Sequence, residues 1–158
     1  MSSSKPTPAP RPLRRRALVR AFAALATVWV SPRLQAQGVA EFRLIVHPSN
    51  PIVSVPRDFV AALFLKKTTR WSDGSLVRPV DLRHDSATRR SFSANVLRRS
   101  VPSMRSYWQQ RIFSGRDVPP PELESDADVV AYVLKNPGAI GYVSQTANVG
   151  PAKSLALR

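Results

Sequence analysis

The sequence contains no cysteine. This absence excludes a disulfide scaffold, a thiolate nucleophile, a zinc site with thiolate ligands and an iron–sulfur cluster. Histidine occurs only as His47 and His84, and two histidines without a ligand spacing are weak evidence for a metal site. Acidic residues are also scarce: 10 Asp and Glu stand against 24 Lys and Arg, a net charge of +14 in a chain of 158 residues. A chain of this length predicts a single domain.

No apolar run suggests a membrane span. The uncharged apolar run at residues 21–30 is half the roughly 20 residues that a transmembrane helix needs. It follows a basic block at residues 11–20 and precedes Leu34 and Ala36, small or apolar side chains of the kind that a signal peptidase reads. This order is typical of a secretory signal peptide, which we place at residues 1–36.

Export changes the meaning of the positive charge. Seven of the 24 basic residues and no acidic residue lie in the predicted leader, so the mature domain at residues 37–158 keeps a net charge of only +7. We expect this domain to be periplasmic, with no membrane span and no nucleic-acid partner. A basic disordered tail is the alternative interpretation of the leader. Arg15-Arg16 approximates a twin-arginine signal, but the general secretory route is preferred. Four arginines are expected to form an exposed helix face: Arg89, Arg90, Arg98 and Arg99.

Apolar periodicity after residue 41 alternates between strand and helix patterns. The expected strands lie at residues 42–46, 76–82, 139–143 and 155–157. The expected helices lie at residues 56–67, 87–97, 102–113 and 126–135, and Lys66 and Lys67 fall in the last turn of the first. Large side chains expected in the core are Met104, Tyr107, Trp108, Ile112, Phe113 and Tyr142. Strands alternating with helices indicate crossover connections, so we predict an α/β domain with a small, mostly parallel sheet flanked by helices.

Five motifs carry a resemblance to a known family. They are Leu63–Lys67 at a helix end, Thr69–Gly74 with its Trp-x-Asp-Gly turn, Pro79-Val80, Asp85–Thr88 with Phe92, and Asn136–Val143 with the string Pro-Gly-Ala-Ile-Gly-Tyr-Val. Together they resemble the phosphate-binding periplasmic proteins of ABC transporters, especially their short, single-lobe relatives. The resemblance implies a type II periplasmic-binding-protein-like fold that forms one lobe.

The resemblance also implies an anion site. In that family, phosphate is held by an arginine followed within a few residues by Ser-Gly-Thr at a helix start, which corresponds here to Arg83, Ser86, Ala87 and Thr88. The free N–H groups and the dipole of a helix N-terminus favour anions, and hydroxyl and guanidinium groups donate to phosphate oxygens. Ser49, after the first strand, is a further candidate ligand. In the alternative interpretation, Ser86 only caps the helix and Arg83 is solvated.

An enzymatic function is not expected. Asp81, His84 and Ser86 are the residue types of a hydrolase triad, but so short a segment cannot readily give the geometry of nucleophile, base and orienting acid. No cofactor or metal is predicted. We expect an exported solute-binding protein that binds phosphate or a similar oxyanion, with an ABC transporter permease as a partner. The alternative is an adaptor of the same fold that binds no ligand and pairs with a periplasmic protein or with a second copy of itself.

Overall fold

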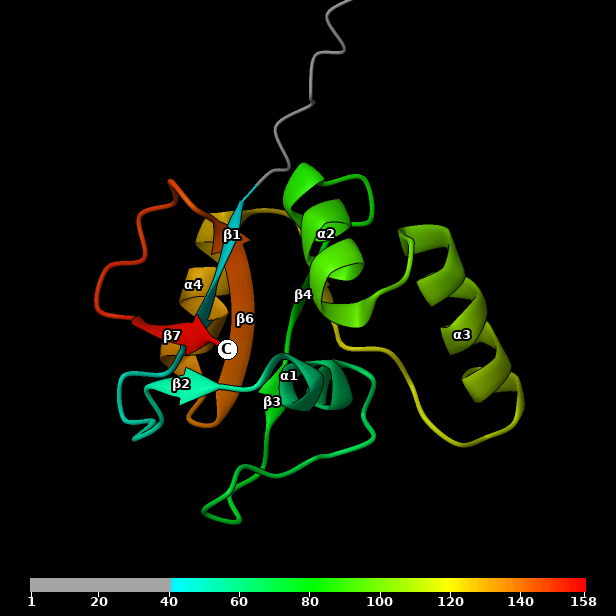
Figure 1. Cartoon of the computed structure of the whole chain (residues 1–158), viewed down its shortest axis with the longest axis horizontal. Coiled ribbons are helices and arrows are strands. Elements are labelled where there is room, and N and C mark those ends of the chain that lie inside the picture. Colours follow the sequence, from blue (N-terminus) through cyan, green and yellow to red (C-terminus); the bar gives the residue numbers. More distant parts are fainter. Residues whose placement is uncertain (1–40) are drawn as a thin grey trace, which may run out of the picture. The chain divides into compact units, whose positions relative to one another are not determined.

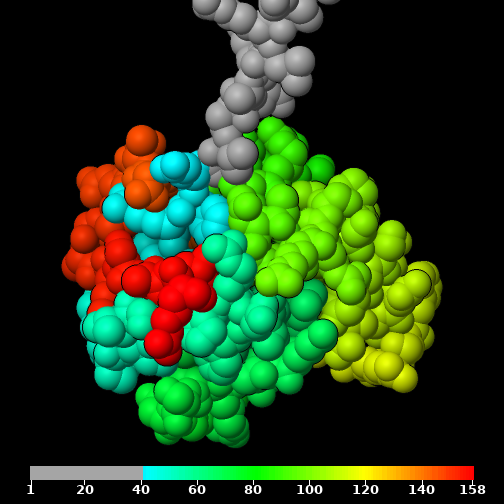
Figure 2. All heavy atoms as spheres, in the orientation of Figure 1, coloured from blue at the N-terminus to red at the C-terminus, as the bar shows by residue number. Residues whose placement is uncertain are grey.

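The computed structural model describes residues 41–158 (Figures 1 and 2). The predicted signal peptide at residues 1–36 and the first residues of the predicted mature domain lie outside the described residues, so their boundary stays a prediction. Among residues 41–158, no helix has the length and apolar character needed to cross a membrane.

A five-stranded sheet forms the centre of the described residues (Figure 1). Its middle strand, β1 (Phe42–Val46), pairs antiparallel with β6 (Ala139–Ser144) on one side and with β7 (Lys153–Leu157) on the other. The short edge strands β2 (Ser54–Val55) and β3 (Arg78–Pro79) pair parallel with β7 and β6. The order is therefore β2-β7-β1-β6-β3, and β1 alone runs against the other four strands.

The predicted α/β class with a mostly parallel sheet is confirmed, since four of the five strands run in one direction; the exception is β1, which is antiparallel to both of its neighbours. The reason lies in the turn after β1, where the N–H of Asn50 donates to the carbonyl of His47 at 2.9 Å. Residues 47–53 alone carry the chain from β1 to β2. A parallel return needs a crossover of about a dozen residues or more, so this short connection reverses the chain.

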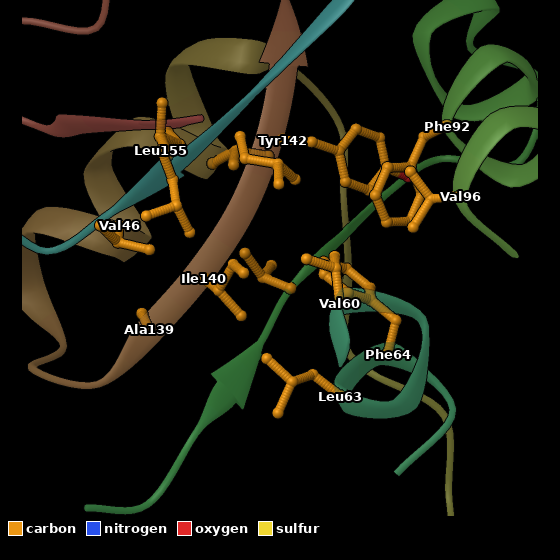
Figure 3. Close-up of a cluster of buried hydrophobic side chains, with 14 of the residues drawn as sticks. Val46, Val60, Leu63, Phe64, Phe92, Val96, Ala139, Ile140, Tyr142 and Leu155 are labelled. Atoms are coloured by element: carbon orange, nitrogen blue, oxygen red, sulfur yellow. The ribbon is translucent and has the colours of Figure 1, made fainter. Parts of the chain in front are cut away.

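Helices cover both faces of β6, which explains its run of apolar residues without alternation. On one face, a Cβ atom at Gly141 would lie 2.6 Å from a valine methyl group of α4 (Asp126–Lys135), so only glycine fits there. On the other face, the Tyr142 ring stacks on Phe92 with a centroid distance of 3.9 Å. The ring centroid of Phe64 lies 4.7 Å from that of Phe92, so the three rings pack together in the core (Figure 3).

Helix α1 (Arg57–Phe64) ends three residues before the predicted boundary. Lys66 adopts the left-handed conformation with φ 53°, and the N–H of Lys67 donates to the carbonyl of Ala62 at 2.9 Å. These features form a Schellman motif, in which the chain turns away from the helix axis. The two lysines therefore lie beyond the helix and not in its last turn.

The predicted strand at residues 76–82 is two strands in different sheets. The N–H of Val80 still donates to β6, whereas the N–H of Asp81 donates to the residue that precedes β5 (Glu122–Leu123). β4 (Asp81–Leu82) then pairs parallel with β5 in a separate two-stranded sheet. β5 was not predicted, because two residues are too few to show a periodic pattern.

The helix that follows β4 spans the predicted residues. α2 (Ala87–Phe92) continues without a break into the π-helical segment η1 (Ser93–Leu97), which ends where Arg98 turns left-handed with φ 53°. The start of this helix is the candidate site that the sequence indicates.

Helix α3 (Val101–Phe113) lies at the side of the molecule, away from the large sheet (Figure 1). Met104 and Trp108 are buried as predicted. Ile112 is 50% exposed and Phe113 is 90% exposed, so their predicted place in the core is wrong. The periodic pattern identifies the apolar face of a helix, but it cannot show that the neighbouring structure ends before the last turn.

Candidate functional site

Ser86 is the N-cap of α2, as the sequence predicts. Its Oγ accepts a hydrogen bond from the N–H of Arg89 at 3.3 Å. The N–H groups of Ala87 and Thr88 belong to the first turn, in which a helix offers no carbonyl acceptor. Thr88 is only 7% exposed, so its side chain lies against the body of the protein. These donors, with Arg83 in the preceding loop, make up the candidate anion site.

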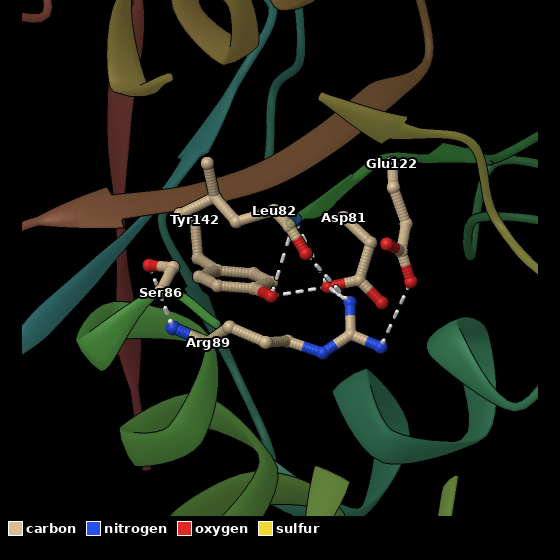
Figure 4. A network of polar contacts seen from close by, with 6 residues as sticks. All are labelled: Asp81, Leu82, Ser86, Arg89, Glu122 and Tyr142. Carbon is tan, nitrogen blue, oxygen red and sulfur yellow. Dashed lines mark hydrogen bonds and ion pairs between the residues drawn. The ribbon is translucent and has the colours of Figure 1, made fainter. Parts of the chain in front are cut away.

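A buried polar network fixes the start of α2 against the strands beside it (Figure 4). The Arg89 guanidinium forms an ion pair with the Asp81 carboxylate and donates to the carbonyl of Leu82 at 3.1 Å. The hydroxyl of Tyr142 donates to the same carboxylate, and burial raises the pKa of Tyr142 well above its ordinary value. Glu122 Oε1 lies 3.8 Å from Arg89 Nη2. The helix start is therefore held by both strands of the small sheet and by β6.

Arg89 contradicts the sequence prediction, since it is 4% exposed rather than part of an exposed face. A signal for its burial was present in the sequence. Arg89 lies three and seven residues before Phe92 and Val96, a spacing that places all three on one side of a helix. The other arginines of the predicted face are exposed, as expected: Arg90, Arg98 and Arg99.

The Arg83 guanidinium faces carboxylates. Its Nε and Nη2 donate to the two carboxylate oxygens of Asp85, and its Nη1 lies 3.3 Å from Glu124 Oε2. The hydrogen bonds from Arg83 lower the pKa of Asp85 to about 2, so this carboxylate is ionised at neutral pH. The Arg83 side chain thus has two negative charges beside its single positive charge, while its backbone carbonyl accepts from the N–H of Ser86 at 3.1 Å.

Ser49 lies apart from the other predicted ligands. β1 begins at Phe42, whose ring centroid is 5.4 Å from that of Phe92 in α2, and Ser49 follows the opposite end of this strand. Its Oγ lies 2.6 Å from Nδ1 of His47. It also lines a separate cavity of about 280 Å³, together with Arg78. The predicted ligands that remain near one another are Arg83, Ser86, Ala87 and Thr88.

The residue types of a hydrolase triad do not interact as a triad. Asp81 binds Arg89 and Tyr142 rather than a histidine, and the Oγ of Ser86 is engaged in the helix cap. Throughout residues 41–158, no three His, Asp or Glu side chains lie close enough together to hold a metal ion.

Comparison with solved structures identifies proteins of similar fold. A phosphate ABC transporter substrate-binding protein from Clostridium perfringens, solved with bound phosphate, matches with a TM-score of 0.58 and 18% identity over 73% of this chain and 44% of that protein. An ABC-type phosphate transport receptor from Vibrio cholerae matches with a TM-score of 0.55 and 16% identity, over 73% of this chain and 45% of that protein. PstS from Borrelia burgdorferi matches with a TM-score of 0.56 and 12% identity, over 74% of this chain and 47% of that protein.

The chain shares the fold of a part of each of these proteins. At these identities the likeness is one of fold, and no family model and no curated protein sequence matches the chain. The chain spans less than half the length of the matched structures, from 44% to 47% for these three. The receptor fold therefore supports the predicted architecture, while the ligand and its site need an argument from this chain's own residues.

Proposed function

We propose that this protein is an exported, single-lobe, periplasmic solute-binding protein that binds phosphate or a related oxyanion and catalyses no reaction. Its fold is shared with phosphate-transport receptors, one of them solved with phosphate bound. Its first 36 residues have the pattern of a leader for export. The observation on which the proposal depends is the group of donors at the start of α2, with Arg83 in the loop that precedes it.

At this site the oxyanion is held mainly by the helix start. The N–H groups of Ala87 and Thr88 donate to its oxygens, and the positive end of the helix dipole adds attraction. α2 and η1 form one continuous helix over residues 87–97, so the dipole is longer than that of α2 alone. The hydroxyl of Thr88 makes no hydrogen bond within residues 41–158 and is a further donor. The methyl group of Ala87 limits how closely an anion approaches the backbone.

The charges around Arg83 set the strength of binding. Asp85 and Glu124 repel a dianion, and one lobe leaves part of the ligand in water, where charged contacts are screened. We therefore expect weak binding by the isolated protein. Covering the site with a partner excludes water and strengthens these contacts. An ABC transporter permease, another periplasmic protein or a second copy of the chain would serve this purpose.

Calorimetric titration with phosphate and sulfate tests the proposal. Thr88→Val keeps the shape of the side chain and removes the hydroxyl, and Arg83→Gln removes the guanidinium. Arg116→Gln is the matched control, because Arg116 is an exposed arginine that follows α3. We expect heat at millimolar phosphate, less heat from the first two variants and no change in the control. The absence of heat at millimolar phosphate and sulfate, or equal binding by Arg83→Gln, would contradict the proposal.

A second function is favoured by the ion pairs of Arg83, whose guanidinium already has carboxylate partners in Asp85 and Glu124. In this alternative, the domain is an interaction module of the receptor fold that binds no small ligand. Light scattering over a range of concentrations distinguishes the two functions. A stable dimer that does not bind phosphate supports the interaction module, whereas a monomer that binds phosphate supports the solute-binding protein.

A further inference from the structure

A small cavity of about 180 Å³ lies between α3 and the structure around β5. Four of its lining residues come from a single face of α3, since they are spaced by four, three and four residues. They are Val101, Arg105, Trp108 and Ile112. The opposite wall includes His84 from the loop before α2, Arg89 from α2 and Glu122 from β5. None of the residues of the proposed phosphate site lines this cavity.

An arginine with no partner among residues 41–158 lines the cavity. The guanidinium of Arg105 is exposed and makes neither a hydrogen bond nor an ion pair with any of residues 41–158. Arg89 is 4% exposed, its guanidinium is already paired with Asp81, and its Nε is buried rather than open to the cavity. Arg105 is therefore the group that favours an anionic occupant.

The rest of the wall is apolar. Trp108 is almost fully buried and is fixed by an edge-to-face contact with Tyr107 at a centroid distance of 5.0 Å. Ile112 is half exposed, although it lines the cavity. An indole and an aliphatic side chain on the same wall suit an apolar group better than a fully solvated ion.

Glu122 limits the charge of the occupant. Its carboxylate lines the cavity while it lies 3.8 Å from Arg89 Nη2, which offsets part of the negative charge. The Glu122 carboxylate would repel a dianion such as hydrogen phosphate, and hydrogen phosphate has no apolar group whose burial would offset this repulsion. A monoanion with an apolar body satisfies the arginine and the indole together.

We propose that this cavity binds a small monocarboxylic acid with an aromatic or branched aliphatic body. The carboxylate pairs with Arg105, and the apolar body packs against Trp108 and Ile112. The site is separate from the phosphate site proposed at the start of α2, so a result that contradicts one proposal does not contradict the other.

Titration of the full chain with benzoate tests this proposal, with benzamide as the neutral isostere. We expect benzoate to bind at millimolar concentration and benzamide to give no heat. Arg105→Gln is expected to weaken benzoate binding by about tenfold or more, because a charge-assisted hydrogen bond is lost. Arg105 is exposed, so this variant should fold, and Arg116→Gln is again the matched control.

Amide resonances in NMR locate the bound benzoate. Shifts concentrated in residues 101–112 support the proposal. Shifts concentrated in residues 83–88, equal binding of benzamide, or an unchanged affinity in Arg105→Gln would overturn it. Phosphate binding by the Arg105→Gln variant is measured in parallel, so failure of the carboxylate site is distinguishable from failure of the phosphate site.

Discussion

Replacing Tyr142 with phenylalanine tests the buried network under the start of α2. The hydroxyl donates to Asp81 and accepts from the N–H of Leu82 at 3.3 Å, while the ring stacks on Phe92. Phenylalanine keeps the ring, and the N–H of Leu82 keeps Asp81 Oδ1 as an acceptor at 3.1 Å. The main loss is one hydrogen bond to an ionised group. We therefore expect the free energy of unfolding to fall by about 2 kcal/mol at neutral pH.

The size of this effect depends on pH, because burial raises the pKa of Tyr142 in the folded state. Below about pH 10 the phenol is neutral in both states and its full contribution is present. At higher pH the unfolded chain releases this proton while the folded protein keeps it. Stability then falls by up to about 1.4 kcal/mol per pH unit. Tyr142→Phe has no phenol to titrate, so its free energy of unfolding does not fall in this way. The difference in free energy of unfolding between the two proteins therefore shrinks above pH 10 and disappears near about pH 11.5.

Urea unfolding followed by circular dichroism, repeated from neutral to strongly alkaline pH, measures both effects. Tyr132→Phe in α4 is the matched control, because the Tyr132 hydroxyl makes no hydrogen bond within residues 41–158. We expect the control to change the free energy of unfolding by less than about 0.5 kcal/mol. Equal losses in the two variants at neutral pH, or a Tyr142→Phe loss that stays constant into strong alkali, would refute the reasoning.

Three further predictions concern other parts of the molecule. Gly141→Ala should lower the free energy of unfolding by about 1–3 kcal/mol, because the new Cβ would lie 2.6 Å from Val129 Cγ1; urea unfolding measures this loss. In carboxyl ¹³C NMR, Asp85 should titrate near pH 2 in the native protein and near its ordinary value of about 3.9 in Arg83→Gln. Its contribution to stability is thus complete above about pH 4 and is lost as pH falls toward 2; an unchanged midpoint in the variant contradicts the ion pair. Phe113→Ser should leave the melting temperature nearly unchanged, because this side chain is 90% exposed, and a large drop in calorimetry would show that it packs against the protein.

Local interactions in the sequence predict the helix starts correctly. Ser86 accepts from the N–H three residues ahead, and Ser125 does the same with the N–H of Asp128 at 3.2 Å. A capping bond depends on residues within one turn, so its signal is contained in a few letters of sequence. The burial of Tyr142 was predicted for a similar reason, since it lies in an unbroken apolar run.

Contacts between distant segments account for the failures. Ser49 was expected near the anion site, but the reversed direction of β1 places it at the other end of that strand. The burial of Arg89 depends on Asp81 and on Glu122, which is 33 residues further along the chain. Neither the direction of a strand nor the partner of a buried charge is encoded in local periodicity. The helix start at Ser86 could be located from the sequence, but the ion pairs that surround Arg83 could not.

The chain passes from one sheet to the other between Val80 and Asp81, and this affects where the sequence can change during evolution. The loop that holds Ser86 is supported by β5 and the residue before it, outside the five-stranded sheet. Insertions or substitutions in residues 114–121 can therefore change the support of this loop while the five-stranded sheet keeps its packing. Among descendants of a common ancestor, this segment is where sequence differences should accumulate at little cost to folding.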